Sequence, residues 1–197
     1  MLLSPRSTFQ YCQHLKFMKT SFLFCALLTF AFSVQGQGTF TYDQQSADEN
    51  ALKEGGLGIQ SNQPIGQSFT PALSSVGFIR LYIYNTGGAI ATVHVNLLAS
   101  SITGNILGSS ETVPISSAAA SYFDFPFSTP ISVTPGTTYF FRPMADSDTV
   151  GVNKGNYNYS GGSAFFTGTS SPQDLWFREG IVVPEPTKRR SPKIPAI

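Results

Sequence analysis

The sequence predicts an all-β domain built as a two-sheet antiparallel sandwich of the jelly-roll type. Between residues 37 and 183, short runs of alternating residue character follow one another, and Gly, Pro, Ser, Thr and Asn separate them. A period of two is typical of half-buried strands, whereas no run of helical period here exceeds about three turns. About nine strands in one domain of this length favour two packed sheets.

The expected strands follow in order, each bounded by turn residues. They comprise residues 38–43, 65–70, 76–84, 91–98, 105–108, 122–127, 137–143, 163–167 and 174–182. In the third strand the aliphatic residues are Ile79, Leu81 and Ile83, and in the fourth they are Val93, Val95 and Leu97. Because Asn85-Thr86-Gly87-Gly88 is a turn sequence, we expect these two strands to form a hairpin. One helix is expected at 47–54, where Gly55-Gly56 ends it.

One local motif supports the sandwich more specifically. Pro135-Gly136 suits a tight turn, and Tyr139 follows three residues after the glycine. This arrangement resembles the tyrosine corner of Greek-key sandwiches, in which the phenol hydroxyl bonds back to nearby backbone. Fibronectin type III domains share the motif, but they are near 100 residues and therefore smaller than the segment 37–183. We therefore expect the larger jelly roll.

An apolar segment precedes the predicted domain. Residues 22–34 form a nearly unbroken apolar run without a charge, with Met18-Lys19-Thr20-Ser21 before it and Gln35-Gly36 after it. This order is typical of a secretory signal peptide, whereas a membrane-spanning helix needs about 20 apolar residues. We predict a signal peptide at 18–36, with translation starting at Met18 and residues 1–17 lying upstream of the true start.

The charge of the chain excludes several classes of partner. Only 12% of all residues are charged, against about a quarter in typical domains. Residues 37–183 carry 5 Lys and Arg against 10 Asp and Glu, a net charge of −5. An acidic domain is a poor match for nucleic acid or anionic lipid. Both cysteines, Cys12 and Cys25, precede residue 37, so the predicted domain has no disulfide framework.

The predicted domain lacks the usual signals of catalysis, and we expect it not to be an enzyme. Beyond residue 36 the sequence has one histidine, His94, and no serine in a Gly-x-Ser-x-Gly motif. The carboxylates Asp124, Asp174 and Glu179 are in principle available for a glycosidase pair, but their spacing selects none of them. A polysaccharide-cleaving enzyme is therefore the least favoured hypothesis.

Aromatic residues are the first candidates for ligand binding, because an exposed ring stacks on the face of a sugar. The candidates are Tyr157, Tyr159 and Trp176, which lie in or near the late strands and loops. The alternative is that these rings pack in the core or cover its rim.

Oxygen-rich loops are the second candidates, and they suggest calcium as a structural metal. Calcium takes hard oxygen ligands from several loops, and the predicted ligands are Asp43, Asp48, Asp146 and Asp148. The alternative is that these acids are solvated loop residues or lie at a helix N-terminus.

A short motif, Val183-Pro184-Glu185-Pro186, follows the last expected strand. It resembles the start of the PEP-CTERM sorting signal of Gram-negative bacteria that produce exopolysaccharide. In that family a signal peptide exports the protein, and a C-terminal Pro-Glu-Pro, an apolar helix and a basic cluster present it to an exosortase. Many such proteins have β-sandwich bodies rich in Gly, Ser, Thr and Asn. The motif residues here are Pro184, Glu185 and Pro186.

The tail departs from the family pattern at one point. Thr187 is followed directly by Lys188-Arg189-Arg190, so no apolar segment separates the motif from the basic cluster. We therefore expect a degenerate, disordered tail over 184–197, with exosortase as a partner only if the sorting signal is intact. The resemblance implies a non-enzymatic protein exported to the surface, matrix or medium of a Gram-negative bacterium. The alternative is a calcium-stabilised carbohydrate-binding module acting on exopolysaccharide.

Overall fold

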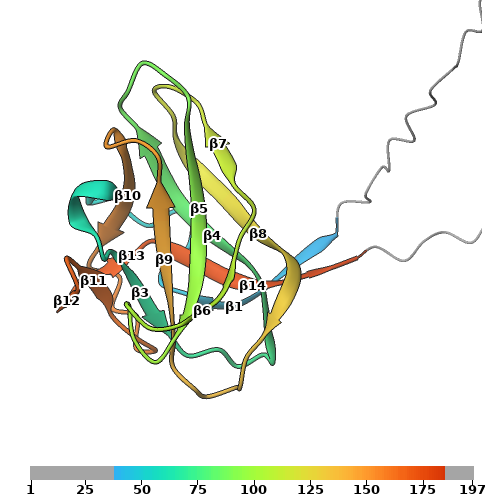
Figure 1. Ribbon diagram of the computed structural model, residues 1–197. Coiled ribbons are helices and arrows are strands. Elements are labelled where there is room, and N and C mark those ends of the chain that lie inside the picture. The colour runs from blue at the N-terminus through green and yellow to red at the C-terminus, as the bar shows by residue number, and fades with distance from the viewer. Residues whose placement is uncertain (1–37, 185–197) are drawn as a thin grey trace, which may run out of the picture. The chain divides into compact units, whose positions relative to one another are not determined.

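Two antiparallel sheets of seven strands each pack face to face in the computed structural model, which describes residues 38–184 (Figure 1). The first sheet contains β1 (Thr39–Gln45), β2 (Gly55–Gly58), β4 (Ser75–Asn85), β8 (Ala120–Ser132), β10 (Val150–Gly155), β13 (Asp174–Leu175) and β14 (Phe177–Val183). The second contains β3 (Gly66–Phe69), β5 (Ala91–Ala99), β6 (Ile106–Ser109), β7 (Val113–Ile115), β9 (Tyr139–Ala145), β11 (Ala164–Phe166) and β12 (Thr169–Ser171). A 3₁₀ helix, η1 (Gln60–Asn62), lies between β2 and β3. The predicted segments 1–17 and 18–36, and the tail beyond Pro184, lie outside the described residues.

The strand order is that of a jelly roll. In the first sheet β14 lies between β1 and β4, and β8 pairs along the other edge of β4. In the second sheet the order is β3, β9 and β5, followed by β6 and β7. Along the chain, β1, β4, β8 and β14 of the first sheet alternate with β3, β5 to β7 and β9 of the second. This arrangement confirms the predicted all-β antiparallel sandwich of the jelly-roll type.

The core lies between the sheets and is built by the alternation seen in the sequence. The aliphatic side chains on the inner faces of β4 and β5 are 0% exposed, and they are Ile79, Leu81, Ile83, Val93, Val95 and Leu97. Full burial of such a side chain contributes about 1.5–3 kcal/mol. The period of two therefore assigns the buried face of both strands correctly.

The predicted hairpin between the strands at 76–84 and 91–98 is wrong. β4 pairs with β8, β10 and β14, whereas β5 pairs with β6, β7 and β9, so the two strands belong to different sheets. Asn85 builds the connection, because its Nδ2 donates to the oxygen of Ala89 and its Oδ1 accepts from the nitrogen of Gly87, both at 2.9 Å. A turn sequence specifies a change of direction but not the partner of the strand that follows.

The tyrosine corner is confirmed. The backbone N–H of Thr134 donates to the Tyr139 hydroxyl at 3.0 Å. Gly136, with φ at +78°, stands at the turn position that requires a left-handed backbone. The phenol thus ties the start of β9 to the turn before it.

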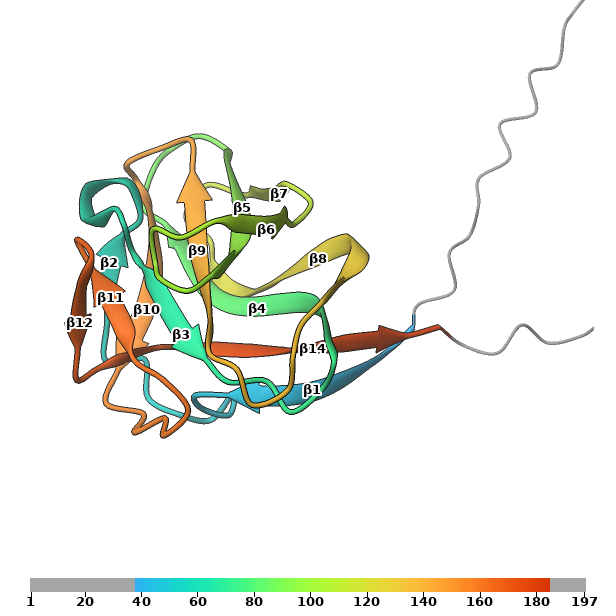
Figure 2. The ribbon, with the colours of Figure 1, turned by 60° about the horizontal axis from the view of Figure 1, so that its bottom comes forward.

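The helix expected at 47–54 does not form. Residues 46–54, which we call the strap, instead run from β1 across the outer face of the first sheet to β2 (Figure 2). The strap turns at Asp48, whose carboxylate accepts hydrogen bonds from the nitrogens of Asn50 and Ala51 at 2.9 and 3.0 Å. So short a helix is marginal on its own, and the strap carbonyls bind side chains of the sheet instead. Trp176 Nε1 donates to the oxygen of Asp48 at 2.9 Å, and the Tyr122 hydroxyl donates to that of Glu49 at 2.8 Å.

Candidate functional site

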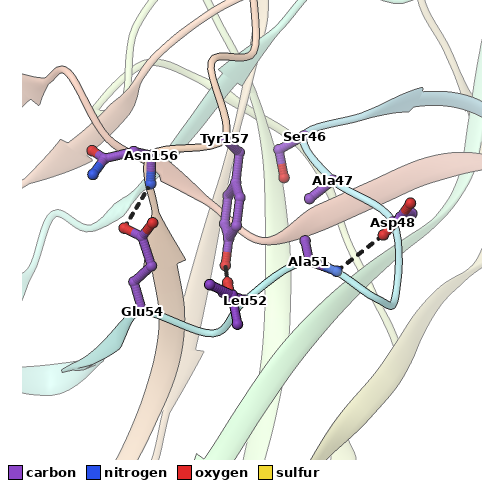
Figure 3. Close-up of a pocket in the computed structure, with 8 residues that line it drawn as sticks. All are labelled: Ser46, Ala47, Asp48, Ala51, Leu52, Glu54, Asn156 and Tyr157. Carbon is purple, nitrogen blue, oxygen red and sulfur yellow. Dashed lines mark hydrogen bonds between the residues drawn. The ribbon is translucent and has the colours of Figure 1, made fainter.

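An open pocket of about 380 Å³ lies between the strap and the loop that follows β10 (Figure 3). It is lined by Ser46, Ala47, Asp48, Ala51, Leu52, Glu54, Asn156 and Tyr157. Its volume falls within the range of about 300–1,000 Å³ that small-molecule sites occupy. The pocket brings together one predicted aromatic residue, Tyr157, and one predicted acid, Asp48.

Tyr157 forms the wall of the pocket opposite the strap. Its hydroxyl lies 2.9 Å from the oxygen of Leu52 (Figure 3). It also lies 2.6 Å from Asn153 Oδ1, and the ring is half-buried. Burial, followed by the charge of Glu54, raises the pKa of the Tyr157 hydroxyl to about 12. The hydroxyl is therefore protonated and engaged with the protein at neutral pH, and the ring face is the part of the side chain left for a ligand.

The carboxylates of the pocket are exposed, and both help to hold its backbone. Glu54 Oε2 accepts a hydrogen bond from the nitrogen of Asn156 at 3.0 Å, and the Asp48 carboxylate caps the turn of the strap. Because ionised carboxylates act only as acceptors, this pocket suits a ligand that donates hydrogen bonds, such as a hydroxyl-rich molecule.

The structure separates the three predicted aromatic residues. Trp176 is 0% exposed, and its ring packs 4.5 Å from that of Tyr122. The strap covers the indole, so its interpretation as an exposed sugar platform is wrong. Tyr159 is half-buried against the core, where its ring meets Phe177 edge-on at 5.1 Å and its hydroxyl lies 3.1 Å from Gln44 Oε1. Only Tyr157 lines the pocket.

The four predicted calcium ligands do not form one site. Asp43 Oδ2 accepts hydrogen bonds from two backbone nitrogens of the β3–β4 loop, each at 2.8 Å. The Asp146 carboxylate binds the nitrogen and the hydroxyl of Thr92 at 2.7 and 2.8 Å, and these bonds lower its pKa. Asp148 is exposed. Across residues 38–184, no group of three or more His, Cys, Asp or Glu side chains is placed to hold a metal ion, so the four-aspartate site is wrong.

The three carboxylates considered for a glycosidase pair have separate environments. Asp124 forms a two-bond pair with Arg80, at 2.6 Å to Nε and 2.8 Å to Nη2. Asp174 is buried and accepts from Gln67 Nε2 at 2.9 Å. Glu179 is also buried, and burial, followed by the nearby charge of Asp43, raises its pKa to about 8. Nothing in these contacts arranges two of them around a common cleft.

The outer face of the first sheet carries an aromatic and guanidinium cluster that the sequence prediction missed. The rings of Phe40 and Tyr42 are 38% and 37% exposed, and the Arg80 guanidinium lies 5.4 and 5.6 Å from their centres. The Arg178 guanidinium lies 4.8 Å from the Tyr42 ring. Such cation–π contacts hold the exposed rings in place. The sequence does contain a signal for this cluster: Arg80 has a buried residue on either side of it in the strand, so its side chain points to the outer face.

Comparison with known proteins gives no relative: no family model matches the chain, and no curated protein matches it significantly. Within the described residues no helix is long and apolar enough to cross a membrane. Of the predicted sorting motif, Pro184 follows β14 directly and is exposed, while Glu185 and Pro186 lie outside the described residues.

Proposed function

We propose that this protein is an exported, non-enzymatic β-sandwich of the PEP-CTERM type, presented at the cell surface or in the extracellular matrix. The observation that carries the proposal is the pairing of β1 with β14, which places Thr39 opposite Val183 (Figure 2). The chain therefore enters and leaves the sandwich at one edge. The predicted signal peptide and the Pro-Glu-Pro motif adjoin these two positions in the sequence.

This geometry suits a domain that is attached at one end and displays the other. The strap and its pocket begin where β1 ends, and β1 has 7 residues. At about 3.3 Å per residue, a strand of this length spans roughly 23 Å. A tether at the paired termini would thus leave the pocket free.

The export step is tested by expressing the full chain in a Gram-negative host and determining its N-terminus by mass spectrometry. We expect a mature protein that begins near Gln37, found in the envelope or the medium. Leu28→Arg, which places a charge in the apolar run, is the matched control and should hold the protein in the cytosol. Wild-type protein that keeps Met1 or Met18 and stays with the control in the cytosol would overturn the proposal.

A carbohydrate-binding module acting on exopolysaccharide is the second candidate, and the pocket favours it. A half-buried tyrosine ring beside carboxylate acceptors is a combination that stacks on a sugar and accepts bonds from its hydroxyls. The test is a glycan array with the wild type, Tyr157→Ala and the control Ile90→Ala, whose side chain is 70% exposed outside the pocket. Binding should be lost only in Tyr157→Ala, and silence of the wild type on every glycan counts against the module.

A further inference from the structure

Arg142 is the one arginine of residues 38–184 that binds no carboxylate of these residues. Arg80 and Arg178 each form an ion pair at 2.6 Å. The Arg142 guanidinium instead makes one long hydrogen bond, from Nη1 to the oxygen of Ile102 at 3.4 Å. Its Nε is buried and has no acceptor in the described part of the chain. Because a guanidinium is always charged in proteins, Arg142 carries a positive charge that the domain does not balance.

The fold places this charge on the outer face of the second sheet. Phe141 and Pro143, the neighbours of Arg142 in β9, are buried, so the Arg142 side chain points the other way. Strand β9 lies between β3 and β5 (Figure 1). Arg142 is half-buried, and only its Nε is closed to solvent without a partner. The Nη groups are therefore the donors that a ligand reaches.

A second donor lies directly beside the guanidinium. Asn96 of β5 is paired with Arg142 in the β5–β9 register, so the two side chains share one face of the sheet. Asn96 is 5% exposed, and its Oδ1 accepts from Ser109 Oγ at 2.6 Å. This bond fixes the orientation of the amide and leaves Nδ2 as the group that donates. Donors from two neighbouring strands are thus held on one face.

Donors grouped around a fixed positive charge favour a carboxylate as the ligand. A guanidinium binds a carboxylate through two parallel hydrogen bonds, and Arg80 does so with Asp124 at 2.6 and 2.8 Å. At Arg142 the Nη2 group is available for such a bond, and Asn96 Nδ2 adds a further donor. Because residues 37–183 carry a net charge of −5, a singly charged carboxylate suits this domain better than a phosphate-rich polymer.

The surroundings of Arg142 favour a sugar over a peptide as the carrier of that carboxylate. Phe140, two residues before Arg142 on the same face, is half-buried, and its ring meets that of Phe165 edge-on at 5.6 Å. An aromatic surface beside polar donors suits the apolar and hydroxyl groups of a sugar ring. Strands β5 and β9 are paired on both sides, so an acidic peptide has no strand edge to join here.

We propose that Arg142 and Asn96 form a binding site for the carboxylate of an acidic sugar, a uronate, on the outer face of the second sheet. The Phe140 ring lies beside the sugar in this arrangement. The strap and its pocket belong to the first sheet, so the site does not depend on the pocket beside Tyr157. It does not depend on export either.

The experiment is isothermal titration of the purified full chain with a short oligogalacturonate and with its methyl ester, which has the same rings without the charge. We expect the acid to bind, more weakly as salt rises, and the ester not to bind. Arg142→Gln should weaken binding of the acid about tenfold or more. Lys154→Gln removes the same charge from β10 of the first sheet, where Nζ bonds to Gln173, and is the matched control that should keep binding.

The comparison of acid and ester uses the wild type alone, so it tests the site even if Arg142→Gln does not fold, which circular dichroism reveals. Three results would overturn the proposal: a wild type that does not bind the acid, equal binding of acid and ester, or a folded Arg142→Gln protein that binds like the wild type. A polyglutamate peptide that binds more tightly than oligogalacturonate would overturn the assignment to a sugar and identify an acidic peptide as the ligand.

Discussion

Replacing Trp176 with alanine should lower the free energy of unfolding by about 3–5 kcal/mol. The indole is 0% exposed and packs 4.5 Å from the Tyr122 ring, so its loss leaves a cavity between the strap and the first sheet. The oxygen of Asp48 also loses the Nε1–H donor that lies 2.9 Å away. Trp176→Phe, the matched control, keeps most of the apolar contact but not this bond, and should cost about 1–2 kcal/mol.

The free energy of unfolding of both variants is measured by urea denaturation, with far-ultraviolet circular dichroism as the signal. Trp176 is the only tryptophan of the chain, so fluorescence serves the wild type alone and should show an indole shielded from acrylamide. A Trp176→Ala protein within about 1 kcal/mol of the wild type would refute this reasoning, because an exposed surface residue changes stability that little. The indole would then regain its place among the candidate sugar platforms.

Three further variants test individual contacts. Tyr139→Phe removes the hydroxyl that accepts from Thr134 at 3.0 Å and should cost about 1 kcal/mol in urea unfolding, so an unchanged midpoint would contradict the tyrosine corner. Arg80→Lys loses the two-bond pair with Asp124 and should lower the free energy of unfolding by about 1 kcal/mol, and by less in high salt. A decrease that is equal at all salt concentrations would contradict a role of this ion pair in stability. Tyr157 and Tyr159 both have a pKa raised to about 12, so the absorbance at 295 nm should still rise above pH 11 in Tyr157→Phe, but by less than in the wild type. Because the unfolded tyrosine releases its proton near pH 10, the wild type should lose stability between pH 10 and 12 more steeply than this variant.

The parts of the fold that the sequence predicted correctly depend on local interactions. The alternation of Ile79, Leu81 and Ile83 places one face of a strand in the core whatever its neighbours are. The tyrosine corner joins Thr134 to Tyr139, five residues apart, so its signature is contained in one short segment. Both features depend only on residues that are close together in the sequence, and both are present in the structure.

The errors concern interactions between distant segments. Trp176 lies at an outward position of the sheet, and it is buried only because Asp48, 128 residues earlier, crosses over it. Likewise, Asp43 lies at a bulge in the register of β1 and β14, two strands from opposite ends of the domain, where Gln44 and not Asp43 is opposite Glu179. No local pattern encodes a strand register or a crossing segment, and so the sequence suggested a helix for the strap and a single calcium site for four aspartates that lie apart.

The strap couples the candidate pocket to the stability of the first sheet. Its carbonyls at Asp48, Glu49 and Leu52 each accept a hydrogen bond from an aromatic side chain of the domain, and the same segment forms one wall of the pocket. A ligand that contacts this wall therefore adds to the bonds that hold the strap down. By linkage, loosening the strap through Trp176→Ala should weaken ligand binding even though the indole does not line the pocket. If Trp176→Ala loses binding, this loss indicates stacking on Trp176 only when the stability of the variant equals that of the wild type.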